Sequence, residues 1–103
     1  MKSNDMQSLW ERRDRLRIMA EIMEVAKGSQ LKTRIMYRVN LSFSQVKEYL
    51  SFLTKMGFLR VRVDKGKKLY KTTAKGNQYI ENYLEMSNLL RSRDHAEAQI
   101  LLR

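Results

Sequence analysis

A chain of 103 residues has room for one domain with a short extension, and 43% of its residues are apolar, enough for a small hydrophobic core. It contains 21 Lys and Arg against 11 Asp and Glu, a formal net charge of +10 that favours a polyanionic partner. The absence of cysteine excludes disulfides, thiolate metal sites and cysteine nucleophiles. No apolar run is long enough for a membrane span or a signal-peptide core, so we expect a cytoplasmic protein without membrane association.

The positive charge is concentrated in the middle of the sequence. Residues 29–57 carry five basic and one acidic side chain, and residues 58–75 carry seven and one. Residues 1–28 and 76–103 are nearly neutral, with net charges of +1 and −1. Because a generally solvated surface would spread its charge, this concentration indicates a contact face.

The first predicted helix spans residues 9–27. Ser8 and Glu11 have the spacing of a capping box, in which each side chain satisfies a free backbone N–H. Apolar residues then recur at steps of three and four, and Gly28 supplies a left-handed stop. The apolar stripe is wide, which predicts burial over much of this helix.

Two shorter helices follow. The first is predicted over residues 31–39, with a turn at Asn40, a residue type that tolerates left-handed backbone. Ser42 and Gln45 form a second capping box at the start of the next helix, which Gly57 ends. Two helices joined by so short a turn form a helix-turn-helix.

A β-hairpin comes next. Residues 59–63 alternate strictly between apolar and basic side chains, which is typical of a half-buried strand. Residues 64–67 predict a hairpin turn in which Gly66 can adopt a positive φ. Residues 69–72 return as a second strand with Tyr70 toward the core. The hairpin is the most basic part of the sequence.

The last helix is predicted over residues 74–103, because Thr73 is a good N-cap and nothing after Gly76 breaks a helix. At 1.5 Å per residue it would be about 45 Å long, too long for so small a domain to cover. Its first apolar residues can dock on the domain, whereas those farther along need a second chain. A short, irregular coiled coil is therefore predicted, and the residues expected to pair are Tyr79, Tyr83, Met86, Leu90, Ile100 and Leu101.

The order of these elements describes a winged helix. A helix, a helix-turn-helix, a two-stranded hairpin and a final helix make a mainly α fold with a small β-hairpin. We expect a winged helix-turn-helix domain over residues 1–75 and a dimerisation helix over residues 76–103.

Five short segments of the sequence form a recognisable set: KTRIMY at 32–37, NLS at 40–42, YL at 49–50, MGFL at 56–59 and YKTTAKG at 70–76. With them the sequence resembles the small archaeal winged-helix DNA-binding proteins, and among these the crenarchaeal ten-a family of abundant, dimeric nucleoid proteins. The resemblance covers residues 12–85. It implies a winged-helix head, a C-terminal helix that pairs antiparallel with its twin, and double-stranded DNA as ligand.

The residues also point to DNA without the resemblance. The second helix of a helix-turn-helix enters the major groove with its N-terminal residues nearest the base edges. Basic side chains of a hairpin can bind phosphates or reach the minor groove, and those of the preceding helix flank the duplex. The predicted DNA-binding residues are Arg34, Arg38, Ser44, Gln45, Lys47, Ser51, Arg60, Arg62, Lys65, Lys67, Lys68 and Lys71.

Two points about this face stay open in the sequence. Gln45 either caps its helix or reads a base, so phosphate contact without base reading stands beside base-specific recognition. Tyr37 and Phe43 are the aromatic residues nearest the basic segments, and helix packing is their expected role, with contact to DNA as the alternative.

No set of catalytic or metal-binding residues is present in the sequence. The single histidine, His95, has no second ligand at a suitable spacing, and there is no glycine-rich phosphate loop. Most methionines fall on inward-facing rows, where packing explains them. We therefore predict a protein with no enzymatic activity, no metal, no cofactor and no small-molecule ligand.

The predicted function is a homodimeric, nucleoid-associated protein that binds double-stranded DNA, in chromosome organisation or in transcriptional regulation. Two heads on a paired helix could bridge two duplexes. The alternative is a winged-helix interaction module whose basic hairpin docks on an acidic protein surface. RNA is a third candidate, but no aromatic-bearing sheet platform is predicted for it.

Overall fold

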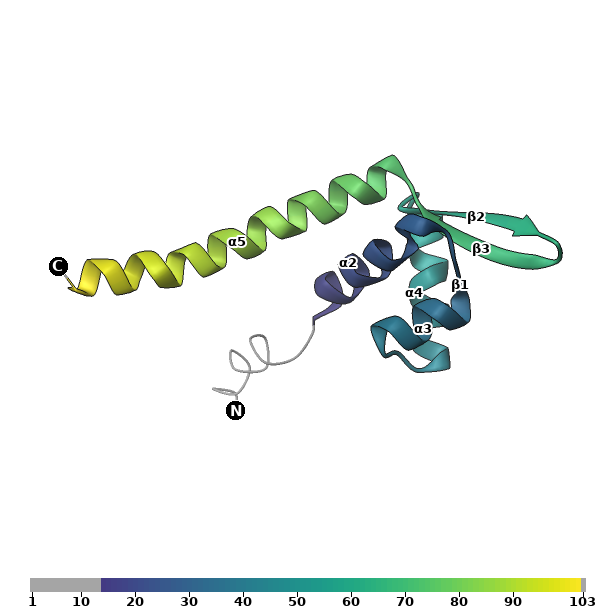
Figure 1. The fold of residues 1–103 in the computed structure, drawn as a ribbon, viewed down its shortest axis with the longest axis horizontal. Coiled ribbons are helices and arrows are strands. Elements are labelled where there is room, and N and C mark those ends of the chain that lie inside the picture. Colours follow the sequence, from purple (N-terminus) through teal and green to yellow (C-terminus); the bar gives the residue numbers. More distant parts are fainter. Residues whose placement is uncertain (1–13, 103) are drawn as a thin grey trace.

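In the computed structural model of the protein, the backbone is described for residues 14–102 and the side chains for residues 14–90. In chain order the elements are α2 (Arg15–Val25), the 3-10 turn η1 (Ala26–Gly28), β1 (Gln30–Leu31), α3 (Lys32–Val39), α4 (Phe43–Lys55), β2 (Leu59–Asp64), β3 (Lys67–Thr72) and α5 (Ala74–Leu102), as Figure 1 shows. The fold is mainly helical with a small antiparallel sheet, and it contains the predicted winged helix-turn-helix. None of the described helices combines the length and apolar character that a membrane span requires.

Helix α2 starts later than the sequence pattern predicts. Asp14 is extended (φ −85°, ψ 174°), and its carboxylate accepts a hydrogen bond from the backbone N–H of Arg17 at 2.8 Å. Asp14 is therefore the N-cap of α2, and the predicted single helix over residues 9–27 is wrong at its start, because the capping residue itself is not helical. It is also wrong at its end: α2 stops at Val25, and the left-handed residue after the 3-10 turn is Ser29 (φ 62°) and not Gly28. The predicted capping box of Ser8 and Glu11 lies outside the described residues.

The helix-turn-helix forms through the local hydrogen bonds that the sequence predicts. Asn40, between α3 and α4, is left-handed with φ 61° and ψ 57°. Ser42 Oγ accepts from the backbone N–H of Gln45 at 3.2 Å, and Gln45 Oε1 accepts from the backbone N–H of Ser42 at 3.0 Å. The capping box is thus complete. Gly57 has φ 84° directly after the C-cap of α4 and ends the helix.

The sheet has three strands, in the order β1-β3-β2, where the sequence predicts only the two strands of the hairpin. In the added strand, Gln30 pairs with Tyr70 and Leu31 pairs with Leu69. Two residues are too few to show an alternating pattern, so this strand depends on the neighbour that it pairs with. It makes β3 the central strand.

The hairpin of β2 and β3 closes through a two-residue turn. Asp64 pairs with Lys67, and the residues between them, Lys65 and Gly66, have φ of 53° and 79°. Positive φ at both positions gives the turn the twist of the flanking strands. The predicted hairpin and its use of Gly66 are confirmed.

A single core joins α2, α3, α4, the sheet and the start of α5. Its largest fully buried side chains are Ile22, Met23, Ile35, Val46, Leu50 and Leu53. The hydroxyl of Thr72, a buried polar residue at the end of β3, donates to the backbone carbonyl of Met23. This bond fastens the central strand to α2 in the middle of the core.

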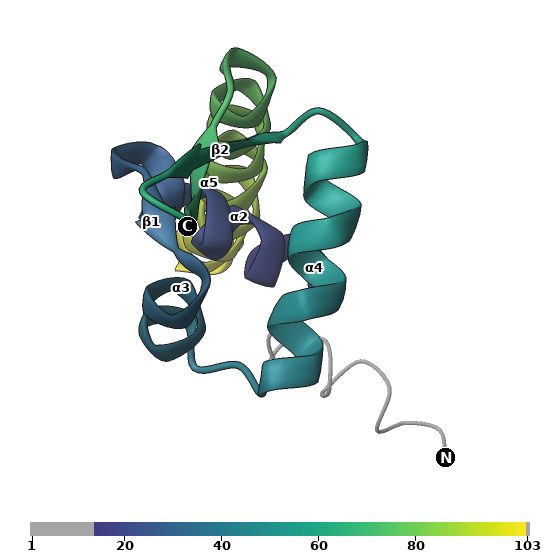
Figure 2. The same ribbon diagram turned by 90° about the vertical axis from the view of Figure 1, so that its right-hand side faces the viewer.

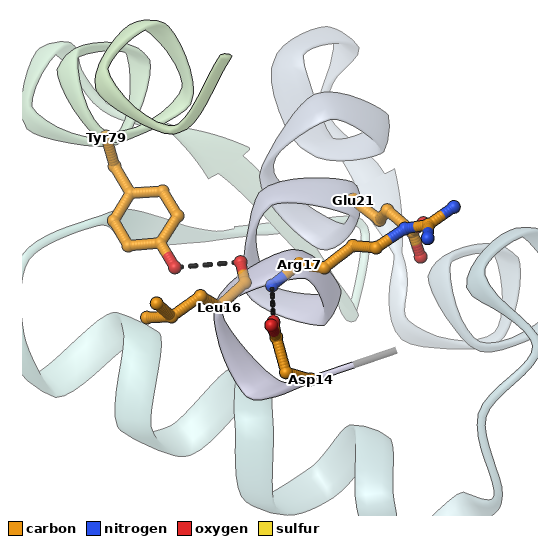
Figure 3. A network of polar contacts seen from close by, with 5 residues as sticks. All are labelled: Asp14, Leu16, Arg17, Glu21 and Tyr79. Carbon is orange, nitrogen blue, oxygen red and sulfur yellow. Dashed lines mark hydrogen bonds and ion pairs between the residues drawn. The ribbon is translucent and has the colours of Figure 1, made fainter. Parts of the chain in front are cut away.

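Thr73 and Tyr79 fix the start of α5 to the domain. Thr73 Oγ1 accepts from the backbone N–H of Gly76 at 3.1 Å and donates to the carbonyl oxygen of Gly57 at 2.6 Å. The Tyr79 hydroxyl donates to the carbonyl oxygen of Leu16 at 2.8 Å, as Figure 3 shows, and its ring meets Phe58 edge-on with centroids 5.3 Å apart. Beyond these contacts α5 runs away from the domain (Figure 1).

Burial raises the pKa of Tyr79 to about 12, with smaller contributions from Tyr83, Asp14 and Tyr49. A tyrosine in the unfolded chain ionises near pH 10, so the folded state keeps a proton that the unfolded state loses. Between about pH 10 and pH 12 the folded state therefore binds more protons, and its stability falls as the pH rises. Below about pH 10 Tyr79 is protonated in both states, and its full contribution to the stability of the folded state is present.

We predict that Tyr79→Phe has two effects on stability. Near neutral pH the lost hydrogen bond to Leu16 lowers the free energy of unfolding by about 0.5–1.5 kcal/mol. Above about pH 10 the variant loses less stability than the unmodified protein, because it has no proton to lose at this position. Urea denaturation of both proteins at neutral pH and at about pH 11 measures the difference, and equal losses would contradict the prediction.

Gly76 lies where no side chain fits. A Cβ at this position would clash with the carbonyl oxygen of Phe58 and would lie 2.6 Å from Thr72 Cγ2. We predict that Gly76→Ala lowers the free energy of unfolding by about 1–3 kcal/mol, because backbone must shift to admit the methyl group. The control is Gly28→Ala, whose Cβ would meet only the Gln30 amide nitrogen at 3.8 Å and should change stability by less than about 0.5 kcal/mol. Equal denaturation midpoints for the two variants would refute this difference.

Candidate nucleic-acid interface

The helix-turn-helix and the hairpin lie at the end of the molecule opposite the far end of α5. Figure 1 shows the β2–β3 hairpin projecting beyond the helices on this side. Figure 2 views the molecule from that end, and α3, α4 and the hairpin are on the near side while α5 recedes behind them. These are the three elements on which the sequence places all the predicted DNA-binding residues.

All twelve predicted DNA-binding side chains are exposed. Two ion pairs are formed between described residues, Arg17 with Glu21 and Lys27 with Glu24, and both lie within α2 and η1. Within the part of the chain that the structure describes, no carboxylate is therefore paired with any of the predicted cations. Their charge faces solvent and is open to a polyanion.

Helix α4 presents a polar face opposite its buried row. Ser44, Lys47 and Ser51 are spaced by three and four residues, so they share one exposed face of the helix. Gln45 is exposed but engaged, since its Oε1 holds the backbone N–H of Ser42. The acceptor oxygen of Gln45 therefore performs the capping role. Its two amide N–H groups and the second lone pair of the oxygen remain for a ligand.

The register of the hairpin divides its cations between the two faces of the sheet. Arg60 lies opposite Lys71, and Arg62 lies opposite Leu69. Directly paired residues share a face, so Arg60, Arg62 and Lys71 share one face and Lys68 stands on the other. A hollow of about 240 Å³ on the first face is lined by Ser29, Arg60, Val61, Arg62, Leu69 and Lys71. A hairpin with cations on both faces can contact phosphates on both sides of a DNA groove.

Two lysines of the basic region are tied to the protein itself. Lys71 Nζ donates to the carbonyl oxygen of Lys27 at 2.9 Å. Lys75 Nζ donates to the carbonyl oxygen of Met56 at 2.7 Å and lies 4.9 Å from the ring centroid of Phe58. Both carbonyls are at the C-terminal ends of helical segments, where a cation is favourable. A phosphate at Lys71 would therefore compete with a structural hydrogen bond.

The two aromatic residues near the basic segments are exposed, so the prediction that they pack between helices is wrong. Tyr37 is 77% exposed and Phe43 is 59% exposed. Phe43 is three residues before the buried Val46, in the first turn of α4. The spacing of apolar residues alone does not show which of them reach the core. In α4 the buried row begins at Val46, so Phe43 lies outside it. Lys32 was not predicted at this site, but its Nζ lies 4.4 Å from the ring centroid of Phe43.

The predicted pairing residues on α5 fall into three groups. Tyr79 contacts its own domain and Tyr83 is half-buried. Met86 and Leu90 are 42% and 44% exposed, on a stretch that also carries the exposed Leu84 and Leu89. Ile100 and Leu101 belong to α5, in its last part, where side chains are not described.

Metal-binding chemistry has no basis in the described part of the chain. No group of three or more His, Asp or Glu side chains lies close enough there to hold a metal ion. The acceptors and donors of the site are lysine and arginine cations, hydroxyls and an amide, which suit phosphates and base edges.

The arrangement of the elements and a match to a family model together define the class of protein. A helix-turn-helix followed by a hairpin that projects beside it is the winged helix-turn-helix arrangement, and a family model described as winged helix-turn-helix matches residues 12–91. The chain belongs to the winged helix-turn-helix family.

Two archaeal proteins are similar to this chain, one in structure and one in sequence. Sso10a-2, a DNA-binding protein from Sulfolobus solfataricus, superposes with a TM-score of 0.70 and 26% identity, over 88% of this chain and 98% of that chain. An uncharacterized protein of Methanocaldococcus jannaschii is 30% identical over 83 residues, which are 80% of this chain and 81% of that protein. The resemblance to archaeal winged-helix DNA-binding proteins is confirmed.

A bacterial regulator has the same fold at lower identity. MepR of Staphylococcus aureus, in its complex with DNA, has a TM-score of 0.62 and 16% identity over 97% of this chain and 86% of that chain. At this identity the similarity shows the fold alone.

Proposed function

We propose that this protein binds double-stranded DNA as a homodimer and acts in the nucleoid, either in chromosome organisation or in transcriptional regulation. The observation that carries the proposal is the exposed positive charge on α3, α4 and the hairpin, which no carboxylate among the described residues pairs and which lies at one end of a winged helix-turn-helix. A similar protein supports it: Sso10a-2 is a DNA-binding protein.

In the proposed complex α4 enters the major groove and the hairpin reaches phosphates or the minor groove. Arg34 and Arg38 on α3 flank the same duplex. The groove face of α4 has two serines and a lysine, and it has no arginine to form the bidentate contact with guanine. Binding is therefore mostly electrostatic, with limited dependence on sequence.

An electrostatic complex of this kind is sensitive to salt. If the dimer neutralises about 6–10 phosphates, its affinity falls by about 10³–10⁵ between about 50 and 200 mM salt, because bound counterions are released. Titration of plain duplex DNA across this range tests the proposal. A protein that docks only on an acidic partner would show no binding to the duplex.

We predict that Arg62→Ala lowers the slope of log affinity against log salt by about one unit and leaves sequence preference unchanged. Arg62 is exposed on β2 and has no carboxylate partner among the described residues. The control is Arg17→Ala, which removes the same charge from a residue already paired with Glu21 at 3.1 Å. If the two variants have the same salt slope, the hairpin is not in the interface.

The choice between chromosome organisation and regulation depends on sequence preference. Competition between a random-sequence duplex and genomic fragments at fixed salt measures it directly. Equal affinity supports packaging, and enrichment of one fragment supports an operator site.

The exposed apolar side chains on α5 support the proposed homodimer. Met86, Leu89 and Leu90 lie on one side of α5 and are between 42% and 70% exposed. Full burial of one leucine side chain is worth about 1.5–3 kcal/mol, so pairing of two such helices is favourable. A second copy of the chain presents the same surface.

We predict that Leu90→Lys converts the dimer to a monomer, or weakens it by at least tenfold, because a lysine ammonium resists burial in the paired helices. The head should remain folded, since it keeps its own core. The control is Asn88→Lys at an exposed polar position of the same helix. Sedimentation equilibrium measures the mass of each protein, and a dimer of unchanged strength for Leu90→Lys would show that this residue is not in the interface.

A further inference from the structure

Phe43 is an exposed aromatic side chain in an otherwise polar region. It is the first residue of α4, and 59% of its surface is accessible. The ammonium of Lys32, the first residue of α3, lies 4.4 Å from its ring centroid. This contact holds the ring between the N-terminal ends of the two helices of the helix-turn-helix.

The position of Phe43 on α4 places it in the face proposed to enter the major groove. Phe43, Lys47 and Ser51 are four residues apart in turn, so they form one row along the helix. All three are exposed. Phe43 is at the N-terminal end of this row, which in a helix-turn-helix is the part nearest the base edges.

The polar groups beside Phe43 are partly used within the protein. Gln45 Oε1 is held by the backbone N–H of Ser42 at 3.0 Å. Ser44 Oγ lies 3.4 Å from Ser42 Oγ. The first turn of α4 thus offers few free hydrogen-bonding atoms to a base, and its largest available group is the phenyl ring.

The major groove displays one apolar group, the C5 methyl of thymine, and a phenylalanine ring is a suitable partner for it. We propose that Phe43 contacts thymine methyl groups and gives the protein a preference for A·T base pairs. The ammonium of Lys32 keeps the ring in place and adds a cation for the adjacent phosphate. This inference rests on the proposed DNA binding, and its test separates the two.

The test removes the methyl group and keeps the base pair. An A·T-rich duplex of mixed sequence is prepared with thymidine and again with deoxyuridine, which has the same hydrogen-bonding edge without the C5 methyl. One methyl contact is worth about 0.8 kcal/mol, which is about a fourfold change in affinity. We expect the unmodified protein to bind the deoxyuridine duplex about fourfold more weakly at the same salt concentration. In a G·C-rich duplex, 5-methylcytosine in place of cytosine should strengthen binding.

Variants at Phe43 then connect the methyl effect to this ring. Phe43→Ser should bind both duplexes equally, and Phe43→Leu should keep part of the difference. The matched control is Phe52→Ser on the same helix. Phe52 is 46% exposed and is nine residues farther along, two and a half turns, so it lies on the opposite side of α4. It should retain the full difference between the duplexes, and thermal melting checks that each variant is folded.

The outcomes distinguish the inference from the function on which it rests. Loss of the thymine preference in Phe43→Ser but not in Phe52→Ser supports the contact. Equal binding of the two duplexes by the unmodified protein overturns it and leaves DNA binding intact. An unchanged preference in Phe43→Ser assigns the effect to the shape of the duplex and also overturns it. Absence of binding to any duplex would instead reject the proposed function.

Discussion

The joint between β3 and α5 is the constraint on which the arrangement of the molecule depends. The Thr72 hydroxyl bonds to the carbonyl of Met23, the backbone N–H of Thr73 bonds to the carbonyl of Phe58 at 3.0 Å, and Gly76 packs where a methyl group would clash. Because β3 is the central strand and α5 begins directly after it, this joint sets the angle between the hairpin and the long helix. In the proposed dimer the same joint would fix the spacing of the two heads.

The positive charge is held apart from the acids of the same chain. Ion pairs among the described residues are confined to α2 and η1, and the cations of α3, α4 and the hairpin have no carboxylate partner there. Clustered like charges destabilise a folded domain, and the core of α2, α3, α4 and the sheet offsets this cost. Binding of a polyanion would remove the repulsion, so the same feature that weakens the free protein strengthens the proposed complex.

The sequence predicted most of the fold, and the candidate site in outline. The capping box of Ser42 and Gln45, the left-handed Asn40 and the positive φ of Gly66 were predictable, because each depends on residues within four positions. The exposure of Phe43 was not predictable, because it depends on where the core ends. The hydrogen bond of Lys71 to the carbonyl of Lys27 joins residues 44 positions apart, and no local pattern indicates it.

The sequence by itself determined the order of the elements and the surplus of cations in residues 29–75, since periodicity, caps and charge are properties of short segments. Only the tertiary structure decided how that charge is arranged: the register of β2 and β3 distributes the hairpin cations over two faces, and β1 exists only because β3 pairs with it. The physical reason is distance along the chain. Hydrogen bonds within four residues form from local sequence, whereas pairing between strands and burial of a side chain depend on segments that meet only in the folded molecule.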